Sequence, residues 1–134
     1  MMTRAPRTAI QAQFSLSYAI AAALVLGDLG PTAYDDIGDP RIRRLEQSVV
    51  VEADRARLRR GAQVTIDIGG NTLTESVDDV AGDPAMPMTK DQVVGKFRRY
   101  TEPILGESEA GSLVRFFLAG DPAEPARRCF TLGR

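Results

Sequence analysis

One side chain near the start of the sequence combines acid–base chemistry with a defined position. Tyr18 stands where a mixed polar stretch gives way to a run of small and apolar residues. A phenol is a poor base at neutral pH, but it can donate a hydrogen bond to a carboxylate or a developing enolate. The sequence contains no histidine, so a general base tuned near neutral pH has no obvious candidate. An aromatic residue at this kind of position also commonly does no more than pack.

Two basic features allow a functional and a structural interpretation. The densest basic cluster consists of Arg55, Arg57, Arg59 and Arg60. It is either a clamp for an anion or carboxylate or a solvated turn, and the lack of interleaved aromatic residues favours the turn. Lys96 is either a proton carrier or a lysine that extends along the polar side of a helix, and the second is the commoner arrangement.

The acidic pairs and the single cysteine indicate little chemistry. Asp35-Asp36 and Asp78-Asp79 each lack a histidine or a spaced third carboxylate, so neither predicts a metal site. Cys129 has no histidine to activate it as a nucleophile. One cysteine excludes an internal disulfide and fits a reducing compartment. Because neither acidic pair has further ligands at a suitable spacing, we expect no bound metal ion.

Composition favours one ordinary soluble domain. The 134 residues include 43% hydrophobic and 26% charged side chains, typical of a globular protein near the modal domain size. The net charge of −1, from 17 basic and 18 acidic residues, argues against nucleic-acid binding. The longest apolar run, Ala19–Leu26, has eight residues, against about 20 for a membrane span. We expect a cytoplasmic protein that binds no nucleic acid and no membrane.

The first half of the sequence predicts an arm, helices and one strand. Residues 1–13 show no periodicity and are expected to form an N-terminal arm. Ser15 is a predicted N-cap for a helix over Leu16–Leu26, which Gly27 ends. Asp39-Pro40 is a helix start signal. Three consecutive valines favour a strand after that helix. The remaining predicted elements here are a short helix over 32–37, a helix over 41–47 and the strand over 48–53.

The second half predicts a hairpin followed by two helices. Residues 63–68 alternate and are followed by a Gly-Gly-Asn turn and a return strand over 72–80. Thr89 and Gln92 form a capping box for a helix with an apolar stripe. A last helix over 107–119 is expected to bury Phe117. Residues 120–134 are expected to form a loosely ordered tail.

These elements predict the α+β class. The expected architecture is a small antiparallel sheet of three visible strands, including a hairpin, covered by helices. Residues 14–119 form the domain. Val64, Ile66 and Ile68 share one strand face and are expected to lie in the core against the helices at 16–26 and 93–100.

Three stretches, in order, resemble the C-terminal domain of the MmgE/PrpD family. They are Ala12–Ala21, with the sequence AQFSLSYAIA; Val64–Gly70, with VTIDIGG; and the segment from Gly82-Asp83-Pro84 through Pro87-Met88-Thr89 to Lys96-Phe97-Arg98, closing with PILG at 103–106. The similarity covers roughly residues 6 to 119. Family members usually have proline before the tyrosine of the first motif, and this chain has Ser17.

The resemblance implies chemistry on small polycarboxylates. The family includes 2-methylcitrate dehydratase, cis-aconitate decarboxylase and iminodisuccinate epimerase, which abstract a proton next to a carboxylate without a metal or organic cofactor. A large helical domain joins a smaller α+β domain, with the site between them. The family's catalytic histidines and lysines lie upstream of the matched stretches, so this chain is expected to be a truncated form. The family's site-facing tyrosine corresponds to Tyr18.

Two classes of function follow. The chain is either the C-terminal domain or split half of such a lyase or isomerase, inactive alone, or a free-standing non-catalytic module that binds a ligand or a protein. The first predicts a helical-domain partner. Both agree with a homo-oligomer, joined through a strand edge or through the helix that carries Tyr18.

Overall fold

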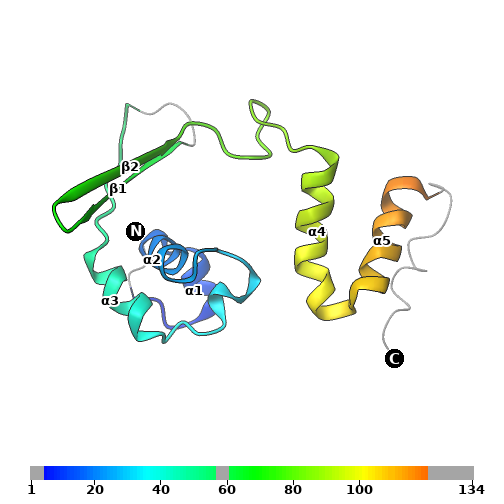
Figure 1. The fold of residues 1–134 in the computed structure, drawn as a ribbon, viewed down its shortest axis with the longest axis horizontal. Coiled ribbons are helices and arrows are strands. Elements are labelled where there is room, and N and C mark those ends of the chain that lie inside the picture. Colours follow the sequence, from blue (N-terminus) through cyan, green and yellow to red (C-terminus); the bar gives the residue numbers. More distant parts are fainter. Residues whose placement is uncertain (1–4, 57–60, 121–134) are drawn as a thin grey trace. The chain divides into compact units, whose positions relative to one another are not determined.

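The computed structural model describes residues 5–56 and 61–120. The chain divides into two compact units, and the boundary between them lies after Ala56 in the sequence. The α+β class is confirmed (Figure 1). No helix in the described part is long and apolar enough to cross a membrane. In chain order the elements are α1 (Ala9–Gln13), α2 (Leu16–Leu26), the 3-10 helix η1 (Pro31–Tyr34), α3 (Pro40–Ser48), β1 (Ala62–Ile68), β2 (Asn71–Val77), α4 (Lys90–Leu105) and α5 (Glu107–Ala119).

Helix α2 has the bounds that its capping residues predict. The Ser15 hydroxyl accepts a hydrogen bond from the Tyr18 backbone N–H at 3.3 Å, which satisfies one of the free donors of the first turn. Gly27 ends the helix in the left-handed region, with φ 75°, where a residue without Cβ carries no strain.

The core of the first unit lies where α2 packs against α3. Its fully buried members are Ala12, Tyr18, Ala21, Ala22 and Ile42. Three of the five are alanines, so the helices can approach closely around the single large ring of Tyr18. Ile42 is the largest aliphatic side chain in this cluster and comes from α3.

Two expectations for the first unit need correction. The arm is not irregular throughout, because residues 9–13 form α1 and the Thr8 side chain caps it. The strand expected over residues 48–53 is not formed: Ser48 ends α3, and residues 49–54 have no regular secondary structure. Val49 does adopt extended angles, but an extended segment becomes a strand only when it joins the hydrogen-bond ladder of a sheet. In the described residues the sheet contains β1 and β2 alone.

The hairpin is confirmed in the register that its turn predicts. Ile66 lies opposite Leu73 and Ile68 opposite Asn71. Gly69 and Gly70 both have positive φ, at 57° and 84°, which is the requirement of a two-residue hairpin turn. The expected burial is only partial, because Val64 and Ile66 are half-buried while Ile68 is 61% exposed.

Helices α4 and α5 form a second pair. The capping box is present in full, since Thr89 and Gln92 each bond the other's backbone N–H. Gly106, with φ 82°, separates the two helices. Phe117, expected in the core, is 60% exposed. Of the predicted tail over 120–134, all but Gly120 lies outside the described residues.

The N-cap of α3 predicts a measurable dependence of stability on pH. The Arg41 guanidinium and backbone N–H both donate to Asp39, and these bonds lower the pKa of that carboxyl to about 2 from 3.8. A lowered folded-state pKa contributes stability above the unfolded value, and this is lost as the pH falls through the folded value. We expect the urea midpoint, followed by circular dichroism, to fall between pH 4 and pH 2.

Asp39→Asn is the control for this prediction, because asparagine keeps a capping oxygen but does not titrate. Its midpoint should fall less over the same range. An identical fall in both proteins would assign the effect to other carboxyl groups.

Candidate functional site

Tyr18 lies wholly inside the first unit. The residue is 0% exposed, and its hydroxyl donates to the carbonyl oxygen of Ala33 at 2.8 Å. Its ring stacks on Tyr34, with centroids 6.0 Å apart. Burial raises the pKa of the phenol above its ordinary value, so the hydroxyl stays protonated at neutral pH. Through this hydrogen bond and this stacking contact, Tyr18 connects α2 to η1.

A polar network begins one residue before Tyr18. Ser17 is 3% exposed, and its hydroxyl donates to Glu46 Oε1 on α3 at 3.1 Å. The backbone N–H of Ala5 donates to the same oxygen at 3.0 Å. Glu46 itself is only 5% exposed. The carboxylate therefore joins three separate segments, namely the chain before α1, the start of α2 and the end of α3.

The number of protons in the network sets the direction of its bonds. The hydroxyl oxygens of Ser15 and Ser17 lie 3.1 Å apart. Each hydroxyl has one proton to donate, and the proton of Ser17 points to Glu46. Ser15 must then donate to Ser17 while its own oxygen accepts from the Tyr18 backbone N–H. A continuous chain of bonds thus runs from the first turn of α2 to Glu46.

Arg43 supplies the charge that balances this carboxylate. Its guanidinium lies 3.4 Å from Glu46 Oε2, three residues along the same helix, and it also donates to the carbonyl of Pro6. A cavity of about 200 Å³ lies beside the pair, lined by Ala5, Arg43, Glu46 and Gln47. Because the arginine is already paired, this cavity has little net positive charge with which to bind a polycarboxylate.

The network suits a structural task better than a chemical one. No buried side-chain nitrogen or oxygen in the described residues lacks a hydrogen-bond partner. A general base needs a free lone pair aimed at substrate, whereas Glu46 accepts from a hydroxyl, an amide and a guanidinium. The arrangement fixes the N-terminus of α2 and the position of Tyr18.

The other candidates from the sequence do not share the burial of Tyr18. Arg55 and Lys96 are exposed, and the remaining arginines of the basic cluster lie outside the described residues, as does Cys129. Asp35 and Asp36 are exposed near the end of η1. In the parts described, no group of three or more His, Cys, Asp or Glu side chains is placed to hold a metal ion.

The sequence pattern did not single out Glu46 as a candidate residue. One signal was present: the helical period places Glu46 four residues after Ile42, on the buried face of α3. A second signal was Ser17, a hydroxyl where the family usually has proline. Ser17 and Glu46 lie on different helices, so their hydrogen bond can be predicted only when α2 and α3 are known to be in contact.

Removing the Tyr18 hydroxyl should destabilise the first unit. In Tyr18→Phe the ring packing stays, but the buried Ala33 carbonyl loses its donor. We expect a loss of about 1–2 kcal/mol in the free energy of unfolding, measured by urea titration. Tyr100→Phe is the matched control, because Tyr100 is 48% exposed. Equal effects of the two substitutions would contradict this role of the hydroxyl.

Removing the Glu46 carboxylate should lower the free energy of unfolding by more than removing the Tyr18 hydroxyl does. Glu46→Ala leaves Arg43 without its carboxylate and takes the acceptor from Ser17 and from the Ala5 N–H. A broken buried pair typically costs about 3 kcal/mol. Glu102→Ala is the control, because the pair between Glu102 and Arg98 also lies within one helix but Glu102 is 35% exposed. This substitution should lower the free energy of unfolding by about 0.5 kcal/mol. Similar losses in both variants would show that Glu46 does not have this anchoring role.

Comparison with known families and proteins identifies the family of this chain. The family model described as the MmgE/PrpD C-terminal domain matches residues 1–116. No curated protein and no solved structure gives a significant match. The match begins before Tyr18 and continues into α5, so it includes the Ser15–Ser17–Glu46 network, the hairpin and the greater part of the helix pair. The chain belongs to the MmgE/PrpD family, as its C-terminal domain.

Proposed function

We propose that this chain supplies the small domain, or split half, of an MmgE/PrpD-type lyase or isomerase that acts on small polycarboxylates. The observation that carries the proposal is the family match over residues 1–116 in a sequence without histidine. The chemistry is dehydration, decarboxylation or epimerisation that starts with proton abstraction next to a carboxylate. A second, helical part carries the base.

The described residues support the view that the base lies elsewhere. Abstraction of a proton from carbon needs a base tuned near neutral pH and aimed at substrate. The two lysines, Lys90 and Lys96, are exposed on α4. Glu46 is buried, and its oxygens are occupied by three donors. The chain alone is therefore inactive in this proposal.

Tyr18 is the one residue that this proposal assigns to the site. Its hydroxyl donates to a substrate carboxylate or to the developing enolate, a role that suits a neutral phenol. The hydroxyl bonds Ala33 in the structure, so it reaches a substrate only after exchanging that carbonyl for the substrate oxygen. The Ser15–Ser17–Glu46 network keeps the backbone of Tyr18 in place during this exchange.

A non-catalytic ligand- or protein-binding module is the alternative. The complete burial of Tyr18 favours it, because a residue that serves only packing needs no access to substrate. The two proposals differ in one requirement: the enzyme needs a partner that carries a base, and the module does not.

Proton exchange into deuterated water tests the proposal directly. The purified chain is mixed with small di- and tricarboxylates, and deuterium incorporation next to the carboxylate is followed by NMR. We expect none from the chain alone. We expect exchange or turnover once a histidine-bearing helical partner, co-purified from the native source and identified, is added.

In the active mixture, Tyr18→Phe should lower turnover about a hundredfold, the typical cost of one donor to a developing oxyanion. Tyr100→Phe is the control and should leave turnover unchanged. Exchange by the chain alone would place the base within this chain, and a partner that restores no activity would favour the binding module.

A further inference from the structure

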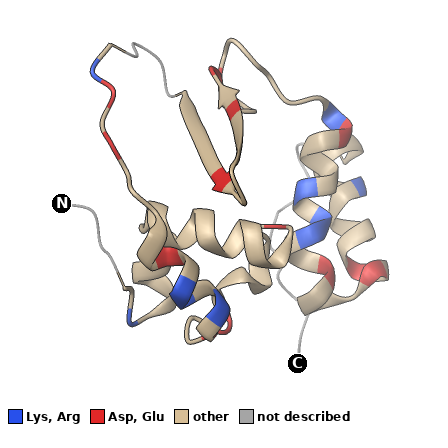
Figure 2. Cartoon of the chain, turned by 60° about the vertical axis from the view of Figure 1, so that its left-hand side comes forward, with Lys and Arg blue, Asp and Glu red and all other residues tan. Residues whose placement is uncertain are grey.

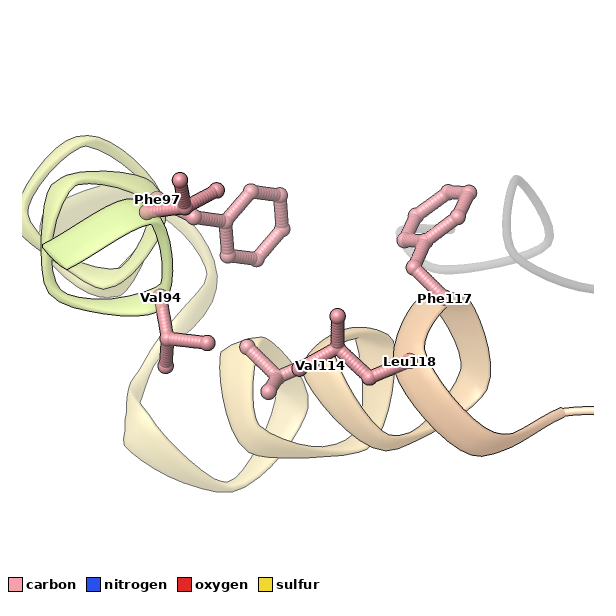
Figure 3. Close-up of a pocket in the computed structure, with 6 residues that line it drawn as sticks. Val94, Phe97, Val114, Phe117 and Leu118 are labelled. Atoms are coloured by element: carbon pink, nitrogen blue, oxygen red, sulfur yellow. The ribbon is translucent and has the colours of Figure 1, made fainter. Parts of the chain in front are cut away.

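A small cavity with charged groups on its wall lies along the second half of α3. It has a volume of about 200 Å³. Its lining residues are Ala5, Arg43, Glu46 and Gln47. Figure 3 shows a different cavity, between α4 and α5 in the second unit, whose lining side chains are all hydrocarbon. The apolar cavity has no polar side chain to orient a ligand, whereas the cavity at α3 offers a guanidinium, a carboxylate and a carboxamide.

The Arg43 guanidinium keeps hydrogen-bonding capacity at the cavity at α3. A guanidinium carries five N–H donors. One of them donates to Glu46 Oε2, and one donates to the carbonyl of Pro6. Among the described residues, the other three have no acceptor. The arginine side chain is 28% exposed, so a ligand in the cavity can use these donors.

The two oxygens of Glu46 are unequally occupied. Oε1 accepts from the Ser17 hydroxyl at 3.1 Å and from the Ala5 N–H at 3.0 Å. In the described parts of the chain, Oε2 accepts only from Arg43, at 3.4 Å, which is long against the length of about 2.8 Å that is usual for a charged pair. A carboxylate held in this way is a poor base, but its second oxygen can still accept from an ammonium group.

The two charges on the cavity wall are opposite and nearly cancel. Figure 2 shows basic segments beside acidic ones in the first unit, so a single sign does not dominate there either. A ligand with one charge is attracted by Arg43 or Glu46 and repelled by the other. A ligand that carries both charges can place each one against its opposite. The wall is therefore complementary to a small zwitterion.

We propose that this cavity binds a small free α-amino acid. The carboxylate of the ligand accepts from the remaining N–H groups of Arg43 and from the carboxamide of Gln47, and its ammonium group donates to Glu46 Oε2. The cavity volume corresponds to about six water molecules, which suits glycine or alanine better than a large amino acid. The inference does not depend on the proposed function and assigns no role to Tyr18.

NMR titration of the ¹⁵N-labelled chain with glycine tests the site. We expect saturable shifts of the Ala5 and Gln47 backbone amides, of the Gln47 side-chain amide and of Arg43 Nε–H. The expected dissociation constant is about 1–10 mM, which a ligand of so few atoms can reach. Acetate, methylammonium and acetamide, at equal ionic strength, each carry only part of the pattern and should bind at least about tenfold more weakly.

Two substitutions on α3 provide the second arm. Gln47→Ala removes the carboxamide and should weaken glycine binding about fivefold; Gln47 is exposed, so the helix should form as before. Arg44→Ala is the matched control, because Arg44 is equally exposed on α3 but does not line the cavity, and it should leave binding unchanged. Circular dichroism checks the helix content of both variants.

Three results would overturn the proposal. The first is a titration that shows no saturation, or shifts confined to the second unit, up to about 100 mM glycine. The second is binding of acetate or acetamide as tight as that of glycine, which would mean that the pairing of both charges is not what is recognised. The third is equal weakening by Gln47→Ala and Arg44→Ala, which would assign the effect to the general charge of α3.

Discussion

The Glu46 carboxylate is buried in the first unit, where only 5% of the residue is exposed. Hydrogen-bond donors around it offset the free-energy cost of removing its charge from water. A buried carboxylate is tolerated only when donors replace the water it has lost. The hydroxyl of Ser17, the backbone N–H of Ala5 and the guanidinium of Arg43 do so from three directions. Each donor belongs to a different turn or segment, so satisfying the charge also fixes how α2, α3 and the chain before α1 meet.

The position of Tyr18 follows from that constraint. Ser15 caps α2 through the Tyr18 backbone N–H and also bonds Ser17, so the network that serves Glu46 also holds the first turn of α2. The ring is then free to pack among alanines and to bond Ala33. The resemblance to the family predicts that this tyrosine faces a site, and in the structure it is fully buried with its hydroxyl bonded to Ala33.

The second unit follows a different principle. Its helices and hairpin are formed by local signals, yet Ile68, Leu73 and Phe117 remain more than half exposed. Local hydrogen bonds define elements, but they do not bury apolar area, and burial supplies most of the stability of a domain.

The sequence alone determined what depends on neighbours within a few residues. Ser15 and Gly27 bound α2, Thr89 and Gln92 start α4, and Gly69-Gly70 turns the hairpin, because caps and turns are closed by bonds between residues at most four apart. The family motif likewise singled out Tyr18. Only the tertiary structure decided that Glu46 is buried, that the valines after α3 form no strand and that Phe117 is exposed. These outcomes depend on which distant segment lies alongside, and no local preference contains that information.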